Sequence, residues 1–143
     1  MIKNLVEYFE ETQEFYLDKV IYKRIESENT MQSYRVNCTD KIEAILQEQQ
    51  VKIIVERTLA LEPREMFDLS VSYGAVLRFK QDKKDEYDWK NINLAEEFQQ
   101  NGEFVLANLM SRMSLLIAEI TASFGQAPIV LPPGIAPMKS KNI

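Results

Sequence analysis

Few side chains in this sequence could do chemistry. It contains no histidine, and Cys38 is its only cysteine. Histidine is the commonest general base and, together with cysteine, supplies most structural zinc sites. A lone thiol without an imidazole forms no thiolate–imidazole pair. We therefore expect no catalytic residue, no metal and no cofactor, and we expect the protein not to be an enzyme.

The carboxylates of DKKDEYD, residues 82–88, lie close enough in sequence to suggest a cation site. A calcium loop needs a glycine at its sixth position and a bidentate glutamate at its end, and this spacing provides neither. We interpret the segment as a solvated turn that connects two elements.

Arg57 lies on an apolar strand face. In VKIIVERTLAL, residues 51–61, alternate positions carry Val51, Ile53, Val55, Leu59 and Leu61, with Arg57 among them. Because a buried charge is costly unless it is paired, we expect Arg57 to have a partner or an opening to water.

The composition indicates one globular domain of 143 residues, 45% of them hydrophobic and 27% charged. A net charge of −5 argues against nucleic-acid binding, which depends on Lys and Arg. The single cysteine suits a reducing compartment, and MIKNLVEYFEE has no apolar signal-peptide core. The apolar stretch 104–124 contains Asn108, Arg112 and Glu119, so we expect no membrane insertion and a cytoplasmic location.

Most of the chain before residue 80 has the alternation typical of strands. We predict strands over 12–25 and 33–39. The stretch 42–49 fits a strand or a short helix, and we take it as extended. The runs 51–61 and 66–79 form a hairpin around a turn at 62–65. Two further features are a polar turn at 26–30 and Gly74, which indicates a bulge or a close backbone contact.

The period changes to that of a helix after the charged connector. A short helix is predicted over 94–102, ending at Gly102, and a long one over 103–124, ending near Gly125. Antiparallel strands followed by helices predict an α+β two-layer domain. One face of such a sheet has no helix over it, which suits an oligomer or a ligand.

A proline-rich segment, ASFGQAPIVLPPGIAP at 122–137, follows the long helix and holds four of the five prolines. Proline excludes helix and central strand. Ile129, Val130, Leu131 and Ile135 are not typical of a disordered tail, which is polar. We expect an extended strap packed on the protein's own surface, with Leu131 facing the protein.

The helix and strap together, NLMSRMSLLIAEITASFGQAPIVLPPGIAP at 108–137, resemble the SecB family of protein-export chaperones. The hairpin 51–79, with Gly74-Ala75, and the first strand YLDKVIYKRI are similar to the same family, so the resemblance covers about residues 14–137. It implies a four-stranded antiparallel sheet with a long and a short helix on one face. The whole chain, 1–143, would be one such domain, with 1–11 as an N-terminal extension and 126–143 as the strap and tail.

The resemblance also implies a function. SecB-type subunits pair and stack as a dimer of dimers, whose apolar grooves hold unfolded or precursor polypeptides before export. An acidic surface of the sheet docks the motor ATPase SecA, and no cofactor takes part. The expected partners are therefore unfolded polypeptides, SecA and further copies of this chain.

Three sets of residues match family positions. The substrate-binding set is Val36, Cys38, Phe67, Leu77 and Phe79; the subunit-interface set is Leu69, Val71 and Tyr73; the partner-docking set is Asp18, Glu62 and Asp68. For the first two sets the alternative is ordinary core packing. For the acids it is solvated surface charge.

Two departures from the family pattern favour a second hypothesis. MKSKNI follows Pro137, where the family continues into a second helix, and Ser70 stands where another acid is expected. The alternative function is a scaffold or dedicated interaction protein with the SecB fold and no general chaperone activity. Finding one recurring partner rather than many clients would favour it.

Overall fold

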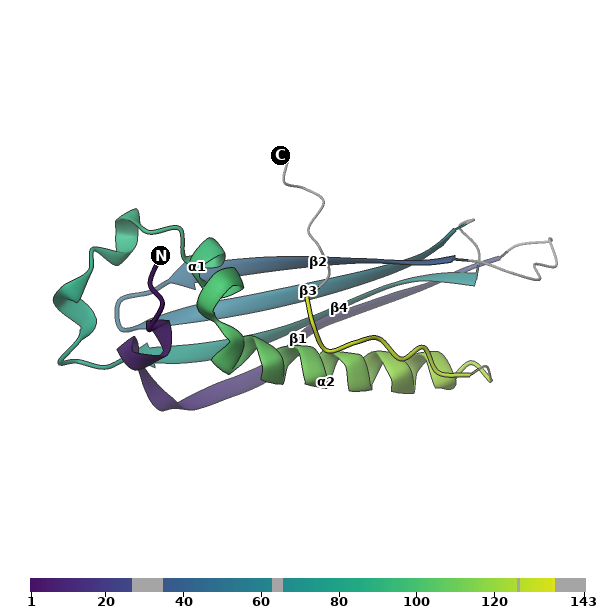
Figure 1. Cartoon of the computed structure of the whole chain (residues 1–143). Helices are drawn as coiled ribbons and strands as arrows, with labels where there is room; N and C mark the ends of the chain where they lie inside the picture. The colour runs from purple at the N-terminus through teal and green to yellow at the C-terminus, as the bar shows by residue number, and fades with distance from the viewer. Residues whose placement is uncertain (27–34, 63–65, 126, 136–143) are drawn as a thin grey trace.

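The fold is built on a four-stranded antiparallel sheet (Figure 1). The computed structural model describes residues 1–26, 35–62, 66–125 and 127–135. The strands are β1 (Phe9–Ile25), β2 (Arg35–Leu46), β3 (Gln50–Glu62) and β4 (Met66–Phe79), in the order β1-β4-β3-β2. The predicted α+β class with four antiparallel strands is confirmed.

The alternation in β3 and β4 determines which face of the sheet is covered. Val55 pairs with Tyr73 and Leu59 with Leu69, so the odd-numbered residues of both strands share one face. That face, here called the inner face, carries the buried apolar side chains. They are Val51, Ile53, Val55, Leu59 and Leu61 on β3, and Phe67, Leu69, Val71, Ala75, Leu77 and Phe79 on β4.

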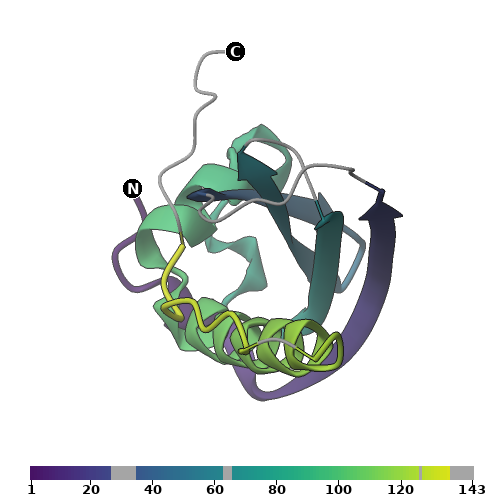
Figure 2. The same cartoon turned by 90° about the vertical axis from the view of Figure 1, so that its right-hand side faces the viewer.

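Two helices follow the strands and lie on the inner face (Figure 2). α1 (Leu94–Asn101) begins at Asn93, whose side chain accepts a hydrogen bond from the backbone N–H of Glu96. α2 (Glu103–Ala122) runs along β4. Its buried side toward the sheet consists of Val105, Leu106, Leu109, Met110, Met113, Ile117 and Thr121.

The corner between the two helices requires Gly102. A Cβ at this position would lie 2.3 Å from the carbonyl oxygen of Phe98 and 2.9 Å from its Cα. Because these are backbone atoms, any other residue would have to shift the end of α1. Close packing against Phe98 therefore requires a glycine at this position, where the sequence predicted the end of the short helix.

By length and composition α2 could also span a membrane, with a mean hydropathy of 1.4. The core helix of a globular domain meets the same criteria. In this structure one side of α2 is buried against the sheet, which is how a core helix packs.

Residues 1–11, predicted as an N-terminal extension, include a segment that packs on the core. Leu5–Tyr8 form a 3-10 helix, and Ile2, Leu5 and Tyr8 are buried. The backbone N–H of Ile2 donates to Oε1 of Glu97 on α1, at 2.7 Å. The packing was not predicted because polar, exposed residues such as Asn4 and Glu7 separate the few buried ones in the sequence. The segment closes one end of the core.

β2 is one continuous strand, where the sequence suggested two segments at 33–39 and 42–49. Its even-numbered residues face inward throughout, from Val36 opposite Leu61 to Leu46 opposite Val51. The inward position in the middle is Asp40, whose charge breaks the apolar pattern. The predicted turn at 26–30 begins with Glu26, which is exposed, and the predicted turn at 62–65 begins with Glu62, the last residue of β3. The other residues of both turns lie outside the described residues.

Gly74 lies under the ring of Tyr16, its neighbour on β1. A Cβ at Gly74 would be 2.2 Å from Cζ of this tyrosine. The predicted close contact is confirmed. The irregularity in strand pairing lies on β1 instead, between Leu17 and Lys19, and it exchanges the faces that β1 residues present.

Candidate functional site

Two helices and one extended segment cover the inner face of the sheet, and they leave part of β1 exposed to solvent. α2 lies along β4, α1 lies against β2, and residues 127–135, here called the strap, run back beside α2 (Figure 1). β1 is at the outer edge of the sheet (Figure 2). The exposed fractions of Leu17, Val20 and Tyr22 are 51%, 40% and 42%.

An aromatic contact connects this open part of β1 to the end of α2. The ring of Tyr22 lies 4.9 Å from that of Phe124 and 6.0 Å from that of Phe67, measured between centroids. Phe67 is buried, whereas Phe124 is 37% exposed. Leu17, Val20, Tyr22 and Phe124 together are called the β1 surface below. It is apolar and accessible in the isolated chain.

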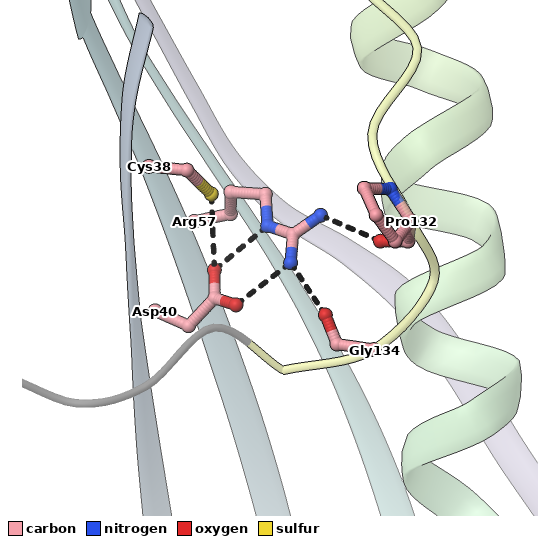
Figure 3. A network of polar contacts seen from close by, with 5 residues as sticks. All are labelled: Cys38, Asp40, Arg57, Pro132 and Gly134. Carbon is pink, nitrogen blue, oxygen red and sulfur yellow. Dashed lines mark hydrogen bonds and ion pairs between the residues drawn. The ribbon is translucent and has the colours of Figure 1, made fainter.

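Arg57 forms a buried ion pair with Asp40 on the inner face (Figure 3). Nε and one Nη of Arg57 donate to the two carboxylate oxygens of Asp40, each at 2.7 Å. The two side chains are 2% and 0% exposed. Asp40 and Arg57 are direct cross-strand partners, which places the carboxylate beside the guanidinium.

The remaining donors of Arg57 point at the strap (Figure 3). One Nη donates to the carbonyl oxygen of Pro132 at 3.2 Å, and the other donates to that of Gly134 at 2.7 Å. Burial alone would lower the pKa of Arg57, but the hydrogen bonds and the charge of Asp40 more than offset this and raise it. The guanidinium is therefore a permanent donor. The predicted need of Arg57 for a partner is confirmed.

Cys38 lies next to this ion pair. Its Sγ is 3.9 Å from Oδ1 of Asp40. Burial and the nearby carboxylate raise the pKa of the Cys38 thiol, although the charge of Arg57 acts in the opposite direction. The thiol is protonated at neutral pH and behaves as a small apolar group with a weak donor.

A second anchor holds the strap near the end of α2. The hydroxyl of Thr121 donates to the carbonyl oxygen of Ile117 and accepts from the backbone N–H of Ile129, each at 2.8 Å. Ile129, Leu131 and Ile135 are half-buried against the core, whereas Val130 is 74% exposed. The side chains thus alternate between protein and solvent, and Leu131 faces the protein as expected.

The predicted substrate-binding residues fall into two groups. Phe67, Leu77 and Phe79 are buried in the core, where Phe79 stacks on Phe9 at 4.9 Å between centroids. This packing is the alternative given for them, and their predicted role would require the core to open. Val36 and Cys38 are half-buried on β2, next to the core, and their role stays a prediction.

The predicted interface residues also face the helices. Leu69 and Val71 are buried, and Tyr73 is half-buried within reach of charges on α2. In the isolated chain Leu69 and Val71 do not reach the surface. Their role between subunits therefore stays a prediction, with core packing as the observed arrangement.

Of the predicted docking acids, Asp18 and Asp68 have described side chains, and they lie at different positions along the sheet. Asp18 lines a hollow of about 290 Å³ on the outer face of the sheet, together with Lys19, Lys41, Glu43, Ile54, Glu56 and Ser72. Lys19 and Glu56 form an ion pair there at 3.2 Å. Asp68 is half-buried further along β4, and the side chain of Glu62 lies outside the described residues. Docking through these acids stays a prediction.

Sequence reasoning missed Asp40 and the two strap carbonyls. A usable signal was the aspartate at an inward position of an alternating strand, which mirrors Arg57 on the neighbouring strand. The carbonyls carry no side-chain signal at all. Within the described part of the chain, no group of three Cys, Asp or Glu residues is placed to hold a metal ion.

The fold is also found in a solved structure. Over 90% of this chain and 92% of the other, it matches the SecB-like chaperone Rv1957 of Mycobacterium tuberculosis with a TM-score of 0.66 and 10% sequence identity. The chain has a SecB-like fold. That chaperone was solved in complex with a ChAD peptide from the Rv1956 HigA1 antitoxin.

Other comparisons add little to the SecB-like fold. A protein of unknown function from Streptococcus agalactiae matches over 85% of this chain and 95% of its own length, with 13% identity. Its TM-score of 0.43 is too low to support a shared fold. No protein-family model matches the sequence, and no curated protein matches it either.

Proposed function

We propose that this SecB-like protein is a chaperone that holds unfolded or precursor polypeptides on its β1 surface. The observation that carries the proposal is the exposure of Leu17, Val20 and Tyr22 on the inner face of a long edge strand. Apolar side chains next to a strand edge suit an extended polypeptide, which offers both side chains and backbone hydrogen bonds. A likeness in fold to a chaperone solved with a peptide supports the same class of ligand.

The finer parts of the proposal follow from the family resemblance. They are a cytoplasmic location, a role in protein export, docking of SecA and assembly as a dimer of dimers. Exposed apolar residues on both faces of β1, including Ile21 at 52%, support a further copy of this chain as one occupant of that edge.

A specific observation also favours the alternative, a dedicated interaction protein. The matched chaperone was solved with one defined peptide, from an antitoxin. By analogy, this chain would serve one recurring polypeptide partner rather than many clients. Co-purification from the native cell distinguishes the two: many clients support the general chaperone, and one recurring protein supports the dedicated partner.

The test is suppression of aggregation of a chemically denatured model protein by increasing amounts of this one. We expect suppression at near-stoichiometric ratios. The variant Leu17→Ser/Val20→Ser/Tyr22→Ser should lose most of it, because apolar contact drives the binding. The matched control, Ile45→Ser/Val130→Ser, removes exposed apolar side chains elsewhere and should retain it. No suppression at any ratio by the unsubstituted protein would contradict the general chaperone.

A further inference from the structure

The ion pair of Arg57 and Asp40 has a feature that core packing does not explain. A buried ion pair contributes little to stability compared with apolar residues of similar size, because both charges lose their hydration. Here the guanidinium is held by Asp40 on one side and presents donors on the other. Those donors bind a segment whose residues Pro132, Pro133 and Gly134 are themselves exposed. The guanidinium therefore anchors a surface segment of the chain.

The contacts define the chemistry of that segment. Arg57 binds carbonyl oxygens two residues apart, at Pro132 and Gly134, and Pro132 and Pro133 have no backbone N–H. A strand added to a sheet edge has to donate N–H groups to the ladder, so proline is unsuited to it. A site that requires only acceptors therefore takes proline-containing segments that a sheet edge binds poorly.

Apolar side chains complete the recognition. Ile129, Leu131 and Ile135 are half-buried against the core, and Val130 between them faces solvent. The segment held here is thus extended, with branched apolar residues at alternate positions followed by two prolines. Its backbone carbonyls reach the guanidinium.

The strap is attached in a way that allows exchange. It has no strand pairing in the described range 127–135, and its described backbone hydrogen bonds are those to Thr121 and Arg57. It follows Gly125, which has a φ of +84° and open space around its Cα. A segment tethered in this way has an effective concentration of the order of mM, which a free ligand can match.

We propose that Arg57 and Asp40 form a carbonyl-binding site for proline-containing apolar segments of a partner polypeptide. The strap occupies this site in the isolated chain, and the partner segment replaces it. The site is separate from the β1 surface, so it binds its ligand whether or not that surface holds unfolded chains. A partner that carries such a segment is thereby distinguished from one that offers only apolar side chains.

The probe is a fluorescein-labelled peptide with the strap sequence APIVLPPGI, measured by anisotropy with the full chain. In the variant Ile129→Ser/Leu131→Ser the tethered strap competes less. This variant should bind the peptide at least about tenfold more tightly than the unsubstituted chain does. If the variant does not fold, the unsubstituted chain is titrated with peptide instead. The peptide concentration then has to reach a few mM, because the tethered strap has an effective concentration of about that size.

Chemical changes in the peptide test the role of the carbonyls without altering the protein. A thioamide at the position of Gly134 is a poorer acceptor and should weaken binding by about tenfold. A thioamide at the position of Val130, whose carbonyl is not one of the two that Arg57 binds, should change it less than about twofold. Absence of binding to both proteins, equal binding to both, or equal effects of the two thioamides would overturn the proposal. Aggregation suppression is measured separately, so failure of this site and failure of the chaperone function are distinguishable.

Discussion

At the scale of single residues, the ion pair between Asp40 and Arg57 connects three parts of the chain. Both charged groups are buried, and their hydrogen bonds join β2, β3 and the strap. The sequence predicted that Arg57 needs a partner, because its place on an apolar face is visible in the alternation. Asp40, at an inward position of β2, was a candidate, but only the register of β2 on β3 places it opposite Arg57, and no local pattern encodes that register.

Removal of Asp40 should be severe. We expect Asp40→Ala to lower the free energy of unfolding by about 3 kcal/mol, because it leaves the guanidinium buried without its counter-ion. Urea denaturation measures this. The matched control is Glu26→Ala, which breaks the exposed pair with Arg24 and should cause no measurable change. Similar small effects of both substitutions would mean that the pair is hydrated in solution.

Because the pKa of the Cys38 thiol is raised, we expect this thiol to react slowly with alkylating reagents in the folded protein. The ordinary pKa of this thiol is about 9, and burial beside Asp40 raises it. Because only the thiolate reacts, alkylation by iodoacetamide at pH 8 should be slower in the folded protein than in urea, and the rate should rise as pH increases past 9. Equal rates in the folded and unfolded protein at pH 8 would contradict the assigned environment. Cys38→Ser, which has no thiol, sets the background.

At the scale of elements, periodicity explains why some segments were predicted well and others were not. β3 and β4 have apolar residues at alternate positions on both sides of any exception such as Arg57, and both helices have them at spacings of three and four. These elements were found at nearly their observed bounds. β2 was divided because Asp40 occupies an inward position. The N-terminal 3-10 helix was missed because Ile2, Leu5 and Tyr8 are too few and too close to the chain start to form a pattern.

The corner between α1 and α2 should tolerate no side chain. Gly102→Ala would force a Cβ against the backbone of Phe98, so we expect a loss of about 2 kcal/mol in the free energy of unfolding, and a lower Tm. Gly134→Ala is the control, because nothing lies within 4 Å of a Cβ there and its φ is not positive. If the two variants had the same Tm as the unsubstituted protein, the corner would not be packed as described.

At the scale of the whole molecule, the uncovered part of β1 is an exposed apolar surface at a sheet edge, which is typical of a binding site for another polypeptide. Its inner face carries Leu17, Val20 and Tyr22 beside Phe124, and its outer face carries Ile21. Such a strand at the edge of a sheet is available for pairing with another chain. The sequence indicated that the face opposite the helices lacks a cover. Leu17, Val20 and Tyr22 instead lie on the face that carries the helices, where β1 extends beyond them.

Light scattering should give a mass several times that of the single chain, and the dimer of dimers corresponds to four. Val20→Lys/Ile21→Lys places charges on both faces of the edge and should lower the mass, because buried charges oppose association. Lys23→Gln, which removes an exposed charge from the same strand, is the control and should leave the mass unchanged. A single-chain mass for the unsubstituted protein would contradict the proposed assembly.

The strand order β1-β4-β3-β2 also bears on how the polypeptide acquires its structure while it is being synthesised. The meander β2-β3-β4 can form from neighbouring hairpins, whereas β1, made first, has to wait for β4, since Phe15 pairs with Ala75. Such sequence-distant pairing closes a long loop and slows folding. Until β4 leaves the ribosome, the apolar residues of β1 are exposed on a nascent chain. During its synthesis this protein is therefore itself an unfolded polypeptide with exposed apolar residues, which is the kind of ligand that we propose it binds.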